Sequence, residues 1–443
     1  MHGHDAWIVG IGHHVPRWRL TAADGSGRIG FPRAGADEDA VTMGVSAGKS
    51  ALGGLQDEVR TLMFSTARPP YEAKSNATIV HEALRLARRC EAFDAVGPAR
   101  SGIGALRMSA LSDSLSLVVA SDLNYGPPGS AQADGGGDGA AALLVASGRA
   151  VRENGLRGVA RLLGSSSVNM DLLEHWRLPG EWWKRSWGED RFAAKMLAES
   201  VEQALPQALE SAGLTQQQVD RFVVVGTNRR AVSSVQRKLG AGAASLSASI
   251  GDAGSASWAL SLVDAIEQAE ESEVIGLICL EDGCEAVLVE KRSPASERGT
   301  LRASLEAPAQ HATEFDYLVW RGAVQGPLSR RPEPVVPSLP GSARDSAWKF
   351  GGLRRTEQGS ADVARGVGVI REWVADYLAT APEPPLITAR VEYDGIDLQL
   401  DVVDADASRL DVGAEVEGAF RRRWSVEGIH NYVWKVRVRE GWN

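Results

Sequence analysis

Short apolar runs typical of buried strands alternate with amphipathic helical segments along most of this chain, and the alternation occurs twice. Strands that alternate with helices in this way form layered α/β domains. The repetition predicts two similar halves, residues 1–155 and 156–295. The first half has predicted strands over 6–12, 62–65, 115–121 and 140–146 and helices over 37–52 and 76–89; the second has strands over 221–225, 274–280 and 286–290 and helices over 191–212, 230–239 and 257–269.

The rest of the chain has a different composition. Residues 296–345 are richer in Pro, Arg and Ser, which favours a linker. In the remaining segment, 346–443, the run 386–391 carries several β-branched residues, and a turn-type pair, Asp394-Gly395, follows it. Together with a final strand through 432–435, this pattern predicts a small β-barrel.

Composition excludes several classes of protein. The net charge of −9 argues against a general nucleic-acid surface. The three cysteines (Cys90, Cys279 and Cys284) are too scattered for a disulfide framework or a cysteine metal site. No apolar run reaches membrane-spanning length, and the N-terminus has no signal-type apolar region. We therefore expect a cytoplasmic protein that does not contact membranes.

The stretch from Phe93 to Leu106, FDAVGPARSGIGAL, resembles the nucleophile turn of the thiolase superfamily, most closely that of 3-hydroxy-3-methylglutaryl-CoA synthases and ketoacyl-ACP synthases of the third type. The resemblance covers nearly all of residues 5–325 and implies a duplicated, layered αβαβα fold. The C-terminal segment resembles the zinc-ribbon/OB-fold domain that accompanies many thiolases. Other matching segments follow in the family's order: 8–12, 37–39, 70–71, 176–177 and 320–322.

The catalytic positions that this resemblance implies hold unsuitable residues. The family's cysteine matches Ala99, its glutamate Ala67 and its histidine Val225, while Asp252 replaces an asparagine that helps to hold the thioester oxygen. Claisen chemistry needs a thiolate to carry the acyl group, a base, and donors for the oxyanion. The apolar residues supply none of these, so we expect no covalent acyl-enzyme.

Metal sites are not expected either. In the part that resembles a zinc ribbon, Arg355 and Gln358 stand at the first cysteine pair, and the second pair is absent. An arginine cannot replace a thiolate ligand. The pair His13-His14 lacks a neighbouring Cys, Asp or Glu cluster, so we assign it to a loop or surface position.

Several residues near the degenerate positions are candidates for a substrate pocket. Arg68, Tyr71 and Arg100 flank the empty positions and could hold a carboxylate or phosphate, although packing or surface pairing is the alternative. Asp252 could act as a base or could cap the helix that begins near residue 255. Further candidates are His175, in a segment that resembles a substrate loop, and Asn228, in the turn that matches the histidine motif.

Our leading hypothesis is a non-catalytic acyl-CoA-binding or scaffold subunit of a complex that forms or cleaves C–C bonds in acyl thioesters. The alternatives are a cysteine-independent lyase of retro-aldol type, a decarboxylase, or an atypical acyltransferase. CoA or an acyl-carrier thioester would be the ligand, and no permanent cofactor is expected. The resemblance implies a homodimer, or a heterodimer with a thiolase or synthase homologue, through the strand 115–121. Nucleic-acid binding has only the run 421–424, RRRW, in its support.

Overall fold

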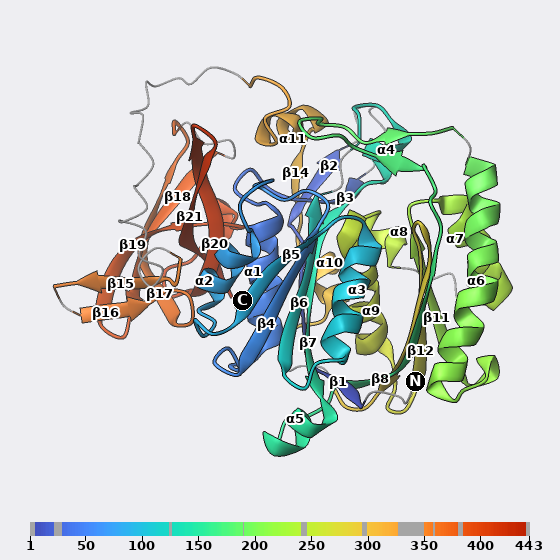
Figure 1. The fold of residues 1–443 in the computed structure, drawn as a ribbon. Coiled ribbons are helices and arrows are strands. Elements are labelled where there is room, and N and C mark those ends of the chain that lie inside the picture. The colour runs from blue at the N-terminus through green and yellow to red at the C-terminus, as the bar shows by residue number, and fades with distance from the viewer. Residues whose placement is uncertain are drawn as a thin grey trace.

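The main body of the protein contains one mixed β-sheet, which consists of two similar halves (Figure 1). The nine strands lie in the order β11-β12-β13-β8-β1-β7-β6-β4-β5. The half-sheets join where β1 and β8 pair over a short overlap around Trp7 and Arg161. This computed structural model describes residues 5–21, 29–123, 126–188, 190–240, 246–294, 299–326, 350–357, 359–379 and 384–439.

The first half contains the parallel strands β4 and β5 and the antiparallel strands β1 and β7, with β6 between β4 and β7. Its strand order is β5-β4-β6-β7-β1. The predicted strands and helices are all present, although the second helix is shorter because Arg85 adopts a left-handed conformation that ends it. The elements are β1 (Ala6–His14), α1 (Ala40–Leu52), β4 (Val59–Thr66), α2 (Ala77–Leu84), β5 (Glu91–Val96), α3 (Ala99–Ala110), β6 (Leu115–Leu123), α4 (Ala131–Gly135), β7 (Asp138–Ser147) and α5 (Gly148–Glu153).

The second half repeats this arrangement. Its strands lie in the order β11-β12-β13-β8, which matches β4-β6-β7-β1 in the first half. Residues 241–245, between α7 and α8, lie outside the described residues. The elements are β8 (Ala160–Asn169), β9 (His175–Trp176), β10 (Arg185–Ser186), α6 (Asp190–Ala212), β11 (Arg221–Gly226), α7 (Arg229–Leu239), α8 (Ser247–Ile250), α9 (Ser257–Gln268), β12 (Val274–Leu280) and β13 (Gly283–Lys291).

Helices and sheet form alternating layers (Figure 1). The helices α3 and α9 pack between the two half-sheets, and Ile103, Trp258 and Leu262 are fully buried there. On the outer faces, α1 and α2 cover the first half-sheet, and α6 and α7 cover the second. This is the layered arrangement that the repeated sequence pattern predicts. None of the described helices has the length and apolarity needed to span a membrane.

Three predictions differ from the structure. The strand β6, which we expected at a dimer contact, is an interior strand that pairs with β4 on one side and β7 on the other, so its edges are not available to a second chain. His13 and His14 belong to β1 rather than to a loop, and His14 is buried. The described part of the expected linker, 299–326, contains regular structure: α10 (Leu301–Glu306), β14 (Gln310–Ala312), which pairs with β2 (Trp18–Thr21) beside β3 (Ile29–Arg33), and α11 (Glu314–Trp320).

The C-terminal segment forms the predicted small barrel. Its strands close in the order β17-β18-β19-β21-β20. The predicted turn joins β18 to β19, where Asp394 and Gly395 both adopt positive φ angles of 48° and 83°. The strands are β17 (Val367–Asp376), β18 (Leu386–Tyr393), β19 (Ile396–Val402), β20 (Glu415–Val426) and β21 (Ile429–Val438), and a separate hairpin of β15 (Leu353–Thr356) and β16 (Gly359–Asp362) precedes them.

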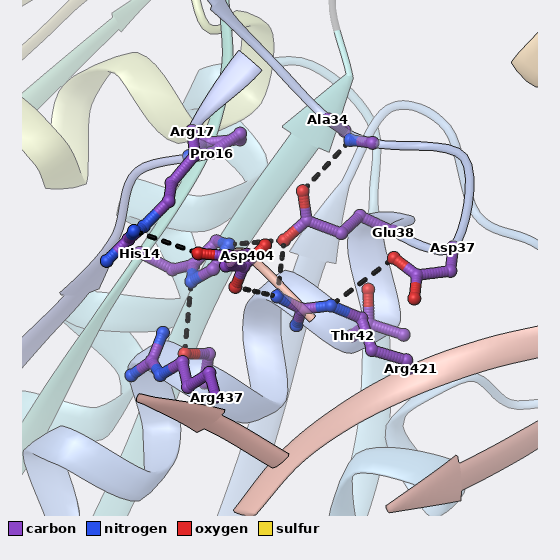
Figure 2. Close-up of polar contacts among 12 residues, drawn as sticks. His14, Pro16, Arg17, Ala34, Asp37, Glu38, Thr42, Asp404, Arg421 and Arg437 are labelled. Atoms are coloured by element: carbon purple, nitrogen blue, oxygen red, sulfur yellow. Dashed lines mark hydrogen bonds and ion pairs between the residues drawn. The ribbon is translucent and has the colours of Figure 1, made fainter. Parts of the chain in front are cut away.

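The barrel is attached to the first half through the acidic start of α1 (Figure 2). Arg421 of β20 is 1% exposed and lies 3.2 Å from a carboxylate oxygen of Glu38 and 2.6 Å from one of Asp404. His14 contacts the same Glu38 oxygen at 2.7 Å. Burial alone would raise the pKa of Glu38, but the charges of Arg421 and His14 lower it below its usual value.

Two further residues of this acidic start have defined roles. Asp39 caps α1 by accepting the Thr42 amide at 3.0 Å, and its other oxygen accepts the Tyr432 hydroxyl at 2.8 Å. The Asp37 carboxylate accepts a hydrogen bond from the Lys435 ammonium group at 2.8 Å. The acidic residues before α1, whose charges the helix dipole favours, therefore also hold the barrel in place.

Candidate functional site

The position that matches the family's nucleophile lies at the N-terminus of a central helix. Ala99 is the first residue of α3 and is 5% exposed, and Pro98 precedes it in an extended conformation. The chain turns from β5 into α3 at Gly97, whose φ of 142° is unfavourable for other residues. The Gly97 amide donates to the Thr66 carbonyl at 3.1 Å, which fixes this turn against the end of β4.

The other positions that the sequence resemblance matched to catalytic residues lie at strand ends or in turns around this helix. Ala67 follows β4, whose last residue, Thr66, pairs with Val96 at the end of β5. Val225 is buried near the end of β11 and pairs with Cys279 of β12. Because β4 and β5 are parallel to each other, and β11 and β12 likewise, their carboxyl ends meet in pairs at the sheet edge.

A carboxylate that the sequence analysis did not single out occupies the space beside Ala99. Glu281 directly follows β12, and its Oε2 atom accepts the Ala99 amide at 2.5 Å. The residue is half-buried. The amide at the start of a helix carries partial positive charge, so it favours an anion at this position. The available signal was an acidic pair, Glu281-Asp282, directly after a buried strand.

The electrostatic environment of Glu281 is mixed. Desolvation by the surrounding protein raises the pKa of Glu281 to about 7, and the negative charges of Asp252 and Asp282 contribute to this rise. Lys184 and the hydrogen bond from the Ala99 amide act in the opposite direction. Desolvation also lowers the pKa of His175, and Lys184 lowers it further. These mutual effects place Lys184, His175 and Asp252 in the same electrostatic neighbourhood.

The structure favours the capping alternative for Asp252. Its Oδ1 atom accepts the Gly254 amide at 2.9 Å and the Ser257 hydroxyl at 3.4 Å, at the start of the helical segment that leads into α9. Its backbone is held to Gly135 and Gly137 by hydrogen bonds of 2.9 and 2.8 Å. Asp252 therefore organises a turn next to Glu281.

Two of the pocket candidates have structural roles elsewhere. The Tyr71 hydroxyl accepts the His430 amide of the barrel at 2.8 Å, so Tyr71 contributes to the contact between the domains. Arg100 pairs with Glu285 at 2.7 Å and donates to the Glu281 carbonyl at 3.2 Å. Arg100 therefore holds the turn that carries Glu281, rather than pointing to a ligand.

The remaining candidates surround the site. Asn228 caps α7 by accepting the Ala231 amide at 3.0 Å, and its amide group donates to Glu174 at 2.7 Å. Arg68 donates to the Trp182 carbonyl at 3.0 Å and thereby connects the end of β4 to the segment between β9 and β10. His175 lies in the short strand β9 and pairs with Ser186. Of the predicted pocket residues, His175 and Asp252 share the electrostatic environment of Glu281.

A second buried carboxylate nearby has a structural role. Asp122, at the end of β6, accepts the Ser255 amide at 2.9 Å and the Leu123 amide at 3.0 Å. The Thr66 hydroxyl also contacts it at 3.2 Å. Asp122 is 1% exposed and connects β4 and β6 to the turn before α9.

None of the cysteines is placed for nucleophilic chemistry. All three are buried. Desolvation raises the pKa of Cys90 to about 11 and that of Cys284 to about 12, and it raises the pKa of Cys279 well above the usual value. Such thiols remain protonated and unreactive near neutral pH.

A metal centre is not defined within the described part of the chain, where no three His, Cys, Asp or Glu side chains gather closely enough. Arg355 lies in the hairpin strand β15, while Gln358 lies outside the described residues. The assignment of this hairpin to a degenerate zinc ribbon therefore stays a prediction.

Comparison with known proteins defines the class of fold. No protein-family model matches the chain. The structure is similar to MvaS in complex with 3-hydroxy-3-methylglutaryl coenzyme A, with a TM-score of 0.57 and 18% identity over 76% of this chain and 95% of that one. It is also similar to 3-oxoacyl-[acyl-carrier-protein] synthase III from Aquifex aeolicus, with a TM-score of 0.53 and 20% identity over 64% of this chain and 99% of that one. The main body thus has a thiolase-like α/β fold, as predicted.

The sequence itself is similar to hydroxymethylglutaryl-CoA synthases. The protein from Pyrococcus furiosus is 30% identical over 199 residues, which cover 41% of this chain and 55% of that relative. The protein from Pyrococcus horikoshii is 27% identical over 254 residues, covering 53% of this chain and 70% of the relative. The first match thus spans about half of the relative's length. The chain is therefore similar in sequence to hydroxymethylglutaryl-CoA synthases over about half of its length, and its main body has a thiolase-like α/β fold.

Proposed function

We propose that this protein binds an acyl thioester of CoA or of an acyl carrier protein without becoming acylated. It would act as a binding or scaffold subunit in a complex that forms or cleaves C–C bonds. The observation that carries this proposal is the pair Ala99 and Glu281 at the N-terminus of α3. The methyl group of Ala99 cannot attack a thioester. The Glu281 carboxylate accepts a hydrogen bond from the Ala99 amide, which would otherwise be available to donate to a thioester oxygen.

Support for the ligand class comes from the likeness to hydroxymethylglutaryl-CoA synthases and from the fold shared with a structure described as a hydroxymethylglutaryl-CoA synthase complexed with CoA. That structure has a TM-score of 0.56 and 15% identity to this chain. A scaffold role also agrees with the charged junction that binds the barrel to α1, because an ordered second domain offers a surface for a partner subunit.

A second candidate function is a cysteine-independent reaction on the same thioesters. Retro-aldol cleavage, decarboxylation and atypical acyl transfer were the alternatives considered from the sequence. Among these reactions, the half-buried Glu281 carboxylate favours the ones that need an acid–base group but no nucleophile.

Binding of acetyl-CoA to the full chain by isothermal titration calorimetry, followed by intact-mass spectrometry, tests the proposal. We expect saturable binding and no mass adduct. Ala99→Phe should weaken binding by about tenfold or more, because the added ring overfills a buried position. Val374→Phe, on a barrel residue that is 62% exposed, serves as the matched control and should bind like the wild type. An acyl adduct would contradict the proposal, and so would equal binding by both variants.

A further inference from the structure

We propose that Glu281 is the acid–base residue of this site: its carboxylate removes a proton from the α-carbon of a bound acyl thioester and returns it in a later step. This inference rests on the proposed binding function, because it needs a thioester in the site. It assigns the role to a residue outside all four positions that the family resemblance indicated, which are Ala67, Ala99, Val225 and Asp252.

The position of the carboxylate supports this role. Its Oε2 atom lies 2.5 Å from the amide nitrogen of Ala99, so the carboxylate lies against the backbone of the residue to which the family resemblance assigns a nucleophile. Arg100 fixes the backbone on both sides of this contact, because it donates to the carbonyl oxygens of Glu281 and Asp282. The Glu281 side chain is therefore held by its own backbone and by the first turn of α3. Its partial exposure leaves it open to a ligand.

The proton transfer needs no co-reactant. The α-carbon–hydrogen bond breaks, an oxygen–hydrogen bond forms on Glu281, and the electron pair of the broken bond becomes part of a thioester enolate. The negative charge moves to the thioester oxygen. Reversal of the transfer returns the proton, so atoms and charge balance within the complex. A base with a pKa of about 7 is suited to this exchange near neutral pH.

Donors for the developing charge lie beside the same turn of α3. The indole Nε1 of Trp258 and the hydroxyl of Ser65 are buried and have no hydrogen-bond partner among the described residues. A Cβ atom built on Gly102, one turn after Ala99, would lie 2.6 Å from the Trp258 nitrogen and 2.9 Å from the Ser65 oxygen. Both residues are 0% exposed. Buried donors without a partner are costly, so thioester binding that opened this turn of α3 to an oxygen atom would gain two hydrogen bonds.

Positive charge is also close to the carboxylate. Lys184 lies near enough to oppose the rise in the pKa of Glu281. The same ammonium charge would stabilise an enolate oxygen in the site. Two other carboxylates are less suitable as bases, because the Asp252 oxygen that caps the turn before α9 accepts two hydrogen bonds and Asp122 is only 1% exposed and accepts two backbone amides.

Hydrogen–deuterium exchange into the ligand tests the inference. Acetyl-, propionyl- and octanoyl-CoA are first titrated into the full chain, and those that bind are then incubated with it in D2O. Mass spectrometry follows deuterium at the α-carbon. We expect exchange with the wild type and a decrease of about 100-fold or more in Glu281→Gln, which retains an acceptor for the Ala99 amide but removes the base.

Glu267→Gln is the matched control. Glu267 lies near the end of α9, where it accepts a hydrogen bond from the Leu301 amide at 2.8 Å and lies 3.8 Å from His13 of β1, and desolvation also raises its pKa to about 7. Its variant should exchange deuterium like the wild type. The wild-type rate should rise with pH and level off above about pH 7, because only the ionised Glu281 can accept a proton.

The outcomes separate the inference from the proposed function. If none of the thioesters binds, the binding function and the inference both fail. If a thioester binds but its α-carbon does not exchange, the binding function stands and the inference is overturned. Exchange that continues unchanged in Glu281→Gln also overturns it, provided that the variant has the circular dichroism spectrum and thioester affinity of the wild type.

Discussion

Arg421 shows how the surroundings decide the role of a charged residue. In the sequence it begins a basic run that could suggest an exposed nucleic-acid surface. In the structure it is buried between Glu38, Asp37 and Asp404, at the junction between the barrel and α1. Its neighbour Arg422 also faces this junction, 3.8 Å from Asp39, whereas Arg423 is exposed. The run therefore supplies the contact between the domains.

Replacement of Arg421 tests this role. Arg421→Met should lower the free energy of unfolding by about 3–5 kcal/mol, because buried carboxylates lose their charge partner. Arg423→Met removes the same charge from an exposed position and should change stability by less than about 0.5 kcal/mol. Urea unfolding followed by tryptophan fluorescence measures both. Equal midpoints for the two variants would show that the junction does not depend on the buried arginine.

At the scale of elements, the approach of α1 to β1 depends on two glycines. A Cβ atom on Gly10 would lie 2.1 Å from the Ala51 carbonyl oxygen, and one on Gly12 would lie 2.2 Å from that of Ala47. Side chains at these positions would push the helix away from the sheet. Because α1 lies so close to β1, Glu38 at the acidic start of α1 is within hydrogen-bonding distance of His14 of β1.

Gly12→Ala should therefore destabilise the protein by about 1–3 kcal/mol, since the added methyl group meets backbone atoms that cannot move independently. Gly104→Ala is the control, because Gly104 lies within α3 and has open space around it. That change should be neutral or should stabilise the helix by up to about 1 kcal/mol. Differential scanning calorimetry compares the two melting temperatures. A Gly12→Ala protein that melts like the wild type would contradict the close-packing argument.

At the scale of the whole molecule, the edge strand β5 is the surface that we propose for self-association. Among the strands of the described residues, it pairs with β4 alone. Phe93 and Val96 on this strand are 46% and 51% exposed. Met108 of α3 and Leu111, which directly follows α3, are 60% and 54% exposed. Unpaired strand edges with apolar side chains tend to be covered by another chain. A second copy placed edge to edge would cover this surface.

Phe93→Asp should convert a dimer to a monomer, because the carboxylate would be buried in the proposed contact. Val374→Asp introduces the same charge at an exposed position of the barrel and should leave the dimer unchanged. Analytical ultracentrifugation at several concentrations distinguishes these states. A wild-type protein that is monomeric at all of them would exclude self-association through β5.

Local patterns determined the elements and their repetition in this protein. Strand-type runs and helical spacing are properties of neighbouring residues, so the two halves, the Asp394-Gly395 turn and the barrel strands were predictable. The alanine at position 99, from which we predict a missing nucleophile, was equally visible, because a motif is read along the chain. Tertiary structure alone decided which distant residues meet. Glu281 reaches the amide of Ala99 from 182 positions away in the chain. Arg421 is buried against Glu38 in the same way, because burial and pKa depend on packing between elements rather than on sequence neighbours.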